Sequence, residues 1–288
     1  MLLGANGQLG KEFHYSLKEK CDLFSFSKDD CDITSFKKVN SLIKKISPEI
    51  ILNTAAYTNV DGAESNSILA CKINSEALEN LSKIANENNS KLVHFSTDYV
   101  FNSKENVPIR EDEKKDPINE YGRSKHLGEE NILKLCKDFF IFRISWVYGK
   151  YGNNFPKKII SLLNNYEKID VIDDQIGIPT PTTLVTSTVE AIFFNENFMK
   201  MRGIYNIAPS GYTNWYEMAR IIKLRLDLIN TEKFSNKKIN PVKSAYFASA
   251  ARRPHYSRLS NEKLRKTFKI NPLNWKVYFK KYIQEQIK

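Results

Sequence analysis

Short apolar runs with strand character alternate with amphipathic helical stretches along most of this chain. Seven such runs are spaced along the sequence, at residues 2–3, 23–26, 50–53, 92–96, 139–144, 169–172 and 204–207. Between them lie stretches with a helical spacing of apolar residues, such as 36–46 and 63–86. Strands that alternate with helices predict βαβ units and a parallel sheet covered on both faces. Because such crossovers are right-handed, we expect an α/β fold with a doubly wound, Rossmann-type sheet.

The composition excludes several other classes of protein. A hydrophobic content of 41% and a charged content of 27% are those of a globular chain. No apolar run approaches the roughly 18–20 residues of a membrane span, and no secretory signal is recognisable, so we expect a cytoplasmic protein. The four cysteines share no CxxC spacing and the four histidines are dispersed, which disfavours zinc. The net charge of +11 comes from lysines spread over many predicted helices, which indicates solvated faces rather than a nucleic-acid surface.

A glycine-rich turn follows the first apolar run. The segment Gly4-Ala-Asn-Gly-Gln-Leu-Gly10 stands between two leucines and a helical stretch, which is the context of a dinucleotide-binding turn. Glycine permits a tight turn and lets the backbone approach a pyrophosphate, and the next helix offers unpaired N–H groups to that phosphate. The spacing is GxxGxxG rather than GxGxxG, so the motif alone also fits a chance glycine-rich turn.

Two further motifs carry candidate catalytic residues. Tyr121 and Lys125 are four residues apart, so on a helix both lie on one face, and a nearby ammonium lowers the pKa of a tyrosine. Thr97 follows a predicted strand at its carboxyl end, where ligands bind in doubly wound sheets, and its hydroxyl can polarise a carbonyl. Alone, each pattern also fits an ordinary surface helix or a strand-end turn. Together and in this order, they favour a site that protonates a carbonyl oxygen as hydride arrives.

With these motifs, the chain resembles the extended short-chain dehydrogenases/reductases and, within them, the dTDP-4-dehydrorhamnose reductase family. The glycine-rich turn and the Tyr-Lys pair specify only the superfamily. The stretches Ser145-Trp-Val-Tyr-Gly149 and Asp173-Asp-Gln-Ile-Gly-Ile-Pro-Thr180 point to the reductase family itself. The resemblance covers nearly the whole chain, and further matching stretches are 53–61, 96–101, 143–149, 153–155, 253–254 and 257–259.

The resemblance implies a role for individual residues. Thr97, Tyr121 and Lys125 correspond to the Ser/Thr-Tyr-Lys catalytic triad, and Tyr121 and Lys125 also contact the cofactor. The other implied cofactor contacts are Gly4, Asn6, Gly7, Gln8, Leu9, Gly10, Asp32, Ile33, Asn53, Ala55, Ala56 and Tyr57. The implied substrate contacts are Thr97, Asp98, Tyr99, Trp146, Asn154, Gln175 and Arg253. Arginine suits a diphosphate because a guanidinium binds phosphate with two parallel hydrogen bonds. For Arg143, which lies inside the strand-like run 139–144, a structural ion pair is as well supported as a functional role.

The residues after the second predicted strand bear on the choice of cofactor. An NAD-specific site places Asp or Glu at the end of that strand, where it binds the ribose 2′-hydroxyl. Here the strand 23–26 is followed by Ser27 and Lys28, which can bind a 2′-phosphate and predict NADPH. Asp29 and Asp30 come next, so NADH stays an alternative if either carboxylate points at the ribose.

The resemblance also raises the question of a metal. Some family members dimerise around a magnesium ion held by carboxylates of the first helix and of a helix after the 173–180 stretch. Glu12 stands at the first position, but the later helix reads Thr182-Thr-Leu-Val-Thr-Ser-Thr188, with no carboxylate before Glu190. Because magnesium prefers anionic oxygen ligands, we expect no metal, and a monomer or a weak homodimer.

We therefore expect an NAD(P)-binding Rossmann domain over residues 1–147 and mainly a smaller substrate-binding lobe over 148–288, with segments 183–208 and 261–288 returning to the first domain. The resemblance implies NAD(P)H-dependent reduction of the C4 keto group of dTDP-4-dehydro-β-L-rhamnose to dTDP-β-L-rhamnose, for cell-surface polysaccharide. The partner is thus a dTDP-4-keto-6-deoxy sugar, with no nucleic acid and no membrane. One alternative is a reductase of another nucleotide 4-keto-6-deoxy sugar. Another is a non-catalytic subunit resembling the regulatory subunit of methionine adenosyltransferase, against which the intact triad weighs.

Overall fold

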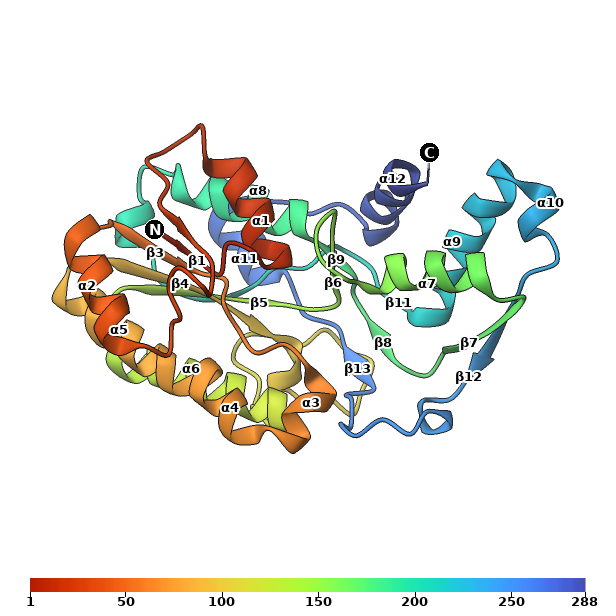
Figure 1. Ribbon diagram of the computed structural model, residues 1–288, viewed down its shortest axis with the longest axis horizontal. Coiled ribbons are helices and arrows are strands. Elements are labelled where there is room, and N and C mark those ends of the chain that lie inside the picture. The colour runs from red at the N-terminus through yellow and green to blue at the C-terminus, as the bar shows by residue number, and fades with distance from the viewer. Residues whose placement is uncertain (288) are drawn as a thin grey trace.

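A computed structural model describes residues 1–287 and places a six-stranded sheet at one end of the molecule and a smaller lobe at the other (Figure 1). All pairs in this sheet are parallel, and the order is β10-β5-β4-β3-β1-β2. The strands are β1 (Leu2–Leu3), β2 (Ser25–Phe26), β3 (Ile50–Asn53), β4 (Lys91–Thr97), β5 (Phe139–Ile144) and β10 (Gly203–Asn206). The predicted α/β fold with a doubly wound sheet is confirmed. The strand order reverses between β1 and β3, where a crevice forms at the carboxyl ends.

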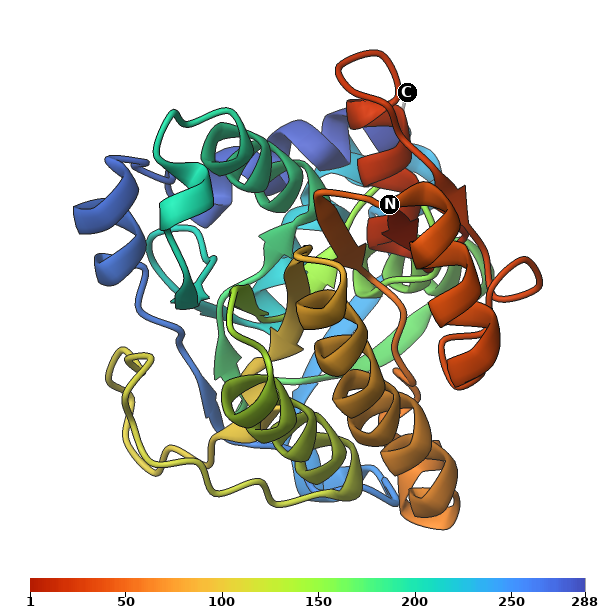
Figure 2. The ribbon, with the colours of Figure 1, turned by 90° about the vertical axis from the view of Figure 1, so that its left-hand side faces the viewer.

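Helices cover both faces of this sheet (Figure 2). One face carries α2 (Phe36–Ile46), α5 (Ala77–Glu87) and α6 (Glu120–Leu135), and the other carries α1 (Gln8–Leu17), α8 (Thr182–Phe193) and α11 (Glu262–Phe268). Successive strand residues point to opposite faces, so Leu2 packs toward α1 and α8 while Leu3 packs toward α2 and α5. Both faces are buried, which is why the strands are continuous apolar runs rather than alternating ones.

The helical stretch predicted over 63–86 is interrupted in the structure. It comprises α3 (Val60–Ser65), α4 (Ser67–Cys71), a π-helical turn η1 (Lys72–Glu76) and α5. In that turn the Asn74 side chain accepts a hydrogen bond from Tyr57 N and donates to Ser124 Oγ of α6. A Cβ at Gly128 would lie 2.0 Å from Asn74 O, so glycine lets α6 approach this closely. The turn thereby fixes the position of α6, which carries Tyr121 and Lys125.

The second lobe has its own small sheets and its own apolar core. β7 (Lys168–Ile172) pairs with β12 (Lys238–Val242), β8 (Ile176–Gly177) lies between β11 (Thr213–Asn214) and β13 (Tyr256–Ser257), and β6 (Val147–Tyr148) pairs with β9 (Thr180–Pro181). Its helices are α7 (Phe155–Asn165), α9 (Trp215–Ile229), α10 (Thr231–Phe234) and α12 (Trp275–Gln286). The single turns of 3-10 helix belong to the molecule as a whole rather than to this lobe alone. They are η2 (Asp98–Val100), η3 (Phe198–Lys200) and η4 (Ser244–Tyr246). The apolar run 169–172 therefore lies in the lobe rather than in the main sheet.

The two segments expected to return from the lobe behave differently. β10 joins the edge of the main sheet beside β5, and α11 packs Leu264 into the core under that sheet. The last helix does not follow α11, because Trp275, Phe279 and Tyr282 of α12 pack around Tyr148 in the core of the lobe. Helix α11 thus packs against the main sheet and α12 in the lobe, while the expected division into domains with returning segments stays a prediction. Within residues 1–287 no helix is both long enough and apolar enough to cross a membrane.

Candidate active site

A cleft of about 870 Å³ lies at the carboxyl ends of the strands, with Trp215 of α9 among its lining residues. It brings together most of the residues that the sequence singled out: Gly4, Asn6, Gly7, Gln8, Leu9, Lys28, Asp32, Ile33, Ala55, Ala56, Tyr57, Thr97, Asp98, Tyr99, Tyr121, Lys125 and Trp146. Five predicted residues lie outside this lining, namely Gly10, Asn53, Asn154, Gln175 and Arg253. Segments more than 200 residues apart in the chain thus meet at one site.

The glycine-rich turn has the geometry that a pyrophosphate requires. Gly4 has φ = +79°, and a Cβ there would lie 2.6 Å from Ala55 N, so only glycine fits. Gly7 N donates to Gly4 O at 3.0 Å, and a Cβ at Gly10 would lie 2.1 Å from Gly4 O. Helix α1 begins at Gln8 without a side-chain cap and without an acidic residue in its first turn. Its first N–H groups and its positive dipole end therefore suit a phosphate, and Gly10 contributes by close packing.

The chain after β2 fits the adenosine end of an NADP molecule. Asp30 accepts hydrogen bonds from Ser27 N at 2.9 Å and Ser27 Oγ at 2.6 Å, and these bonds lower the pKa of Asp30. Its carboxylate is therefore turned back onto the chain rather than toward a ribose. Lys28 is exposed and lines the cleft, where its ammonium suits a 2′-phosphate.

Thr97 and Tyr121 come together from the end of β4 and the first turn of α6. Thr97 Oγ1 donates to Asp98 Oδ1 at 3.1 Å and accepts from Tyr99 N at 3.2 Å. Burial raises the pKa of Tyr121 to about 12, and a hydrogen bond with the Thr97 side chain opposes this rise. Burial also raises the pKa of Asp98 to about 6. A Cβ at Gly122 would lie 2.3 Å from Tyr99 O, so glycine lets the start of α6 close over the strand end.

Lys125 is fully buried, and its contacts include a residue that the sequence did not single out. Its Nζ donates to Phe95 O at 2.7 Å and lies 2.9 Å from His94 Nε2. Burial lowers the pKa of Lys125 to about 7, although the charge of Glu129 raises it. Burial also holds the pKa of His94 well below its usual value, so this ring is neutral. The sequence did contain a signal for His94, because a polar residue inside an apolar strand needs a buried hydrogen-bond partner.

Two tryptophans form an aromatic wall of the cleft. Trp146 and Trp215 stack with ring centroids 3.6 Å apart and an interplanar angle of 14°. Trp146 adopts φ = +47°, and a Cβ at Gly177 would lie 2.4 Å from its ring, so that glycine makes room for it. Trp215 Nε1 donates to Gln175 Oε1 at 3.0 Å. Gln175 therefore orients Trp215, which the sequence did not single out, and its predicted contact with a substrate stays a prediction.

Arg253 and Asn154 have partners within the protein. The Arg253 guanidinium binds the Asp61 carboxylate through Nη1 at 3.2 Å and Nη2 at 2.6 Å. Asn154 caps α7 by accepting from Lys157 N at 3.2 Å, and it donates to Gln8 Oε1 at 3.0 Å. A ligand that reaches either residue has to share or displace these bonds. Their contacts with a substrate remain predictions.

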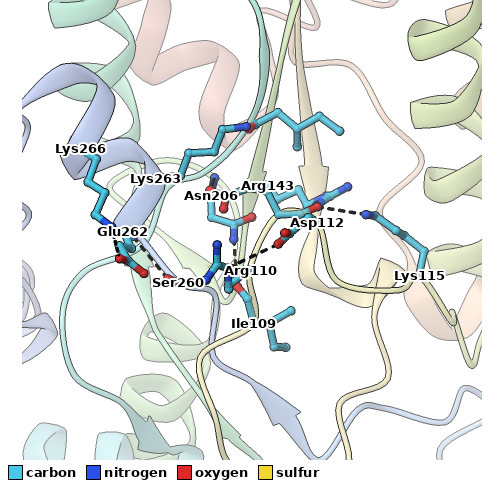
Figure 3. A network of polar contacts seen from close by, with 12 residues as sticks. Ile109, Arg110, Asp112, Lys115, Arg143, Asn206, Ser260, Glu262, Lys263 and Lys266 are labelled. Atoms are coloured by element: carbon cyan, nitrogen blue, oxygen red, sulfur yellow. Dashed lines mark hydrogen bonds and ion pairs between the residues drawn. The ribbon is translucent and has the colours of Figure 1, made fainter.

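Arg143 lies apart from the cleft as a structural ion pair. Its Nε and Nη2 donate to Glu129 at 2.9 and 2.6 Å, and its Nη1 donates to Glu111 O at 2.9 Å. Figure 3 shows Arg143, Lys115 and Asn206 converging on the segment that contains Glu111. Of the two readings open at the level of sequence, the ion pair is thus the one present.

The carboxylates considered for a metal bind other groups. Glu12 accepts from Thr182 Oγ1 at 2.9 Å, and Glu190 accepts from Ser16 and from Lys20 Nζ, the latter at 2.7 Å. In the part of the chain that the structure describes, no three His, Cys, Asp or Glu side chains are grouped as metal ligands would be.

A Rossmann-type sheet, a phosphate-binding turn and a Thr-Tyr-Lys group at the switch point together define a nucleotide-dependent oxidoreductase of the short-chain dehydrogenase/reductase class. Comparison with known proteins narrows this class. Residues 1–287 match the family described as the RmlD substrate binding domain. The chain is 36% identical to dTDP-4-dehydrorhamnose reductase of Escherichia coli K12, covering 99% of this chain and 97% of that protein. It is 34% identical to the spore coat polysaccharide biosynthesis protein SpsK of Bacillus subtilis, at 99% and 97% coverage.

Solved structures agree with these relatives. The dTDP-4-dehydrorhamnose reductase of Bacillus anthracis, in complex with NADP, has a TM-score of 0.90 at 35% identity, covering 99% of this chain and 98% of that one. The enzyme of Clostridium acetobutylicum has a TM-score of 0.91 at 33% identity, covering 100% and 99%. The chain belongs to the dTDP-4-dehydrorhamnose reductase family. The family and the enzyme class predicted from the sequence are therefore confirmed.

Proposed function

We propose that this protein reduces the C4 keto group of dTDP-4-dehydro-β-L-rhamnose to dTDP-β-L-rhamnose with NADPH. The observation that carries the proposal is that Tyr121 and Lys125 line the same cleft as the turn at Gly4 and Gly7. Membership of the reductase family and the NADP complex of the Bacillus anthracis relative support the substrate and the cofactor. The position of Lys28, with the Asp30 carboxylate bound to Ser27, also supports NADPH.

The residues of the cleft divide the chemistry between them. When bound, NADPH supplies the hydride that converts the C4 carbonyl to an alcohol. Tyr121 donates a proton to the carbonyl oxygen, and the Thr97 hydroxyl orients that oxygen by a hydrogen bond. Lys125 holds the nicotinamide ribose and, as an ammonium, stabilises the tyrosinate that proton donation leaves. The stacked indoles of Trp146 and Trp215 cover the apolar side of the deoxy sugar and exclude water.

Oxidation of NADPH in the presence of purified dTDP-4-dehydro-β-L-rhamnose tests this proposal. We expect the absorbance of the reduced nicotinamide to fall and dTDP-β-L-rhamnose to appear in the proton NMR spectrum. The NMR spectrum also distinguishes the two configurations at C4. dTDP-glucose, which has no keto group, serves as the control and should leave NADPH unchanged.

Three outcomes would contradict the proposal. A product of the opposite C4 configuration, or turnover of a UDP-linked 4-keto-6-deoxy sugar in preference to the dTDP sugar, assigns another reductase. Binding of NADPH without any oxidation of it would favour the alternative that the protein is a non-catalytic subunit. The division into residues 1–147 and 148–288 and the monomer or weak homodimer stay predictions, the latter tested by sedimentation velocity.

A further inference from the structure

A buried line of polar side chains lies behind Lys125. Lys125 Nζ is 2.9 Å from His94 Nε2, and His94 Nδ1 is 3.2 Å from Asn53 Nδ2. Exposure of the three residues is 0% for Asn53 and 1% for both His94 and Lys125. Water therefore does not reach these contacts, and each polar atom depends on the donor or acceptor that faces it.

The direction of each hydrogen bond in this line follows from Asn53. Its Oδ1 accepts from Ala55 N at 3.1 Å, which fixes the amide and turns the donor Nδ2 toward His94. His94 Nδ1 must then accept, and a neutral imidazole that accepts at Nδ1 carries its proton on Nε2. That Nε2–H faces Lys125 Nζ. A nitrogen that accepts this hydrogen bond needs a lone pair, which an amine has and an ammonium lacks.

One charge near Lys125, that of Glu129, opposes this arrangement, and it has an ionic partner of its own. Glu129 lies one turn further along α6, but its carboxylate is bound by the Arg143 guanidinium of β5 at 2.9 and 2.6 Å. On the β4 side the nearest titratable group is the neutral ring of His94, and Tyr121 lies one turn earlier on α6. Burial lowers the pKa of Lys125 to about 7, which agrees with the direction set by the hydrogen bonds.

We propose that Asn53 and His94 are positioning residues that hold Lys125 as an uncharged amine, and that this amine takes up a proton when the dinucleotide binds. The inference rests on the proposed function, because it assigns Lys125 to the nicotinamide ribose. Ribose hydroxyl oxygens accept hydrogen bonds from an ammonium, and the negative phosphates favour the positive charge. The proton comes from the solvent and joins the nitrogen lone pair, so the hydrogen bond from His94 Nε2–H to that lone pair is lost. The resulting charge stabilises the tyrosinate form of Tyr121.

Titration calorimetry of NADPH binding in buffers of different ionisation enthalpy measures this proton directly. Near pH 8 we expect the wild-type protein to take up close to one proton per NADPH. Near pH 6 the uptake falls toward zero, because an amine with a pKa of about 7 is already charged. Above pH 7 the affinity for NADPH should fall by up to about tenfold per pH unit. Binding near pH 8 without proton uptake would overturn the proposal.

Three variants assign the proton to this line of residues. Asn53→Asp keeps the acceptor for Ala55 N but also presents an acceptor to His94. This reverses the hydrogen bonds between residue 53 and His94 and between His94 and Lys125. The reversed bonds favour a charged Lys125, so the proton uptake should disappear. Lys125→Met should also abolish it, and any proton that remains belongs to the adenosine 2′-phosphate. Asn59→Asp is the matched control, since it adds a charge at the cleft, keeps the cap of α3 and leaves His94 alone. Uptake in Asn53→Asp equal to that of the wild type contradicts the proposal.

A second measurement needs no variant and therefore does not depend on how Asn53→Asp folds. Nitrogen-15 chemical shifts of the histidine rings distinguish the Nε2–H from the Nδ1–H tautomer. We expect His94 of the cofactor-free protein as the neutral Nε2–H tautomer above about pH 8, where Lys125 is an uncharged amine. An Nδ1–H tautomer or an imidazolium overturns the proposal. Because neither experiment contains a sugar substrate, failure of the reductase assay and failure of this inference are seen separately.

Discussion

Two buried basic side chains, Lys125 of α6 and Arg143 of β5, differ in the partners that surround them. Arg143 is 0% exposed, forms two bonds with the Glu129 carboxylate, and lies 4.9 Å from the centre of the Phe101 ring. Lys125 is equally buried, and its hydrogen-bond partners among residues 1–287 are the His94 ring and the Phe95 carbonyl. Burial alone therefore does not mark a functional residue. A buried cation with a full ionic partner holds the fold together, whereas one with neutral partners is ready to change its charge.

The largest expected effect is on the chemistry that Lys125 supports. Tyr121→Phe removes only the phenolic hydroxyl, so kcat should fall by about 10²- to 10⁴-fold while the Kd of NADPH stays nearly unchanged. Steady-state kinetics and fluorescence titration measure the two quantities. Tyr148→Phe is the control, because Tyr148 is buried in the lobe core away from the cleft and should keep wild-type kcat. A Tyr121→Phe enzyme with wild-type kcat would rule out Tyr121 as the acid.

At the other basic residue, Arg143, the substitution Glu129→Gln of its partner should destabilise the fold. The substitution leaves the buried Arg143 without its counter-charge, which costs about 3–5 kcal/mol of unfolding free energy. Urea denaturation measures this loss. Glu130→Gln, at a neighbouring exposed carboxylate, should change the stability by less than about 0.5 kcal/mol. If both variants are equally stable, Arg143 does not depend on its partner and the contrast between the two cations fails.

An exposed cation provides the baseline for this comparison. Lys28→Ala should lower kcat/KM for NADPH by about tenfold and leave kcat/KM for NADH unchanged, because a hydrogen bond to a charged group contributes about 1.5 kcal/mol. The ratio of the two cofactors in steady-state assays gives the effect. Lys37→Ala, on the exposed side of α2, serves as the control. A higher kcat/KM for NADH than for NADPH, unchanged by Lys28→Ala, would show that Lys28 does not select the cofactor.

A pH dependence of stability is expected from only one of the two buried basic residues. The folded pKa of Lys125, about 7, lies below its ordinary value of 10.5, so the unfolded chain binds more protons between these values. Stability of the cofactor-free protein should therefore rise with pH across this window, by at most about 1.4 kcal/mol per pH unit. Urea unfolding at several pH values, compared with Lys125→Met, isolates the contribution. An unchanged slope in Lys125→Met would contradict it, and Arg143 contributes none because its guanidinium stays charged.

Local patterns were sufficient to predict much of the fold and of the candidate site. The apolar spacing over 36–46 predicts a helix with the bounds of α2, and the strand runs place the carboxyl edge where the cleft lies. Gly4 could be recognised because it belongs to a short glycine-rich motif. Its backbone conformation and its close contacts allow only glycine at this position. Such features depend on residues near each other in the sequence.

The residues that sequence reasoning missed depend on distant partners. His94 meets Asn53, 41 positions earlier, and Lys125, 31 positions later, so its role emerges only when β3, β4 and α6 pack together. Trp215 similarly acquires its place through Trp146 and Gln175, which lie in the loops just before β6 and β8. Gln175 is the opposite case. The family pattern marks this residue, and only the fold shows that its side chain accepts a hydrogen bond from Trp215. Helix α12 packs in the lobe because its aromatic residues Trp275, Phe279 and Tyr282 join Tyr148 in one buried cluster there. No local sequence pattern reveals this packing.

The stacked indoles also give the protein an optical property of its own. The chain has three tryptophans, and two of them lie face to face at 3.6 Å in the cleft, while Trp275 is buried in the lobe core. Two chromophores this close couple their electronic transitions, so the pair should produce a paired positive and negative band in circular dichroism. Trp146 precedes β6 and Trp215 begins α9, and both pack against the core of the lobe, so this signal depends on their stacking there. Ligand entry beside the pair can therefore be followed in the unlabelled protein.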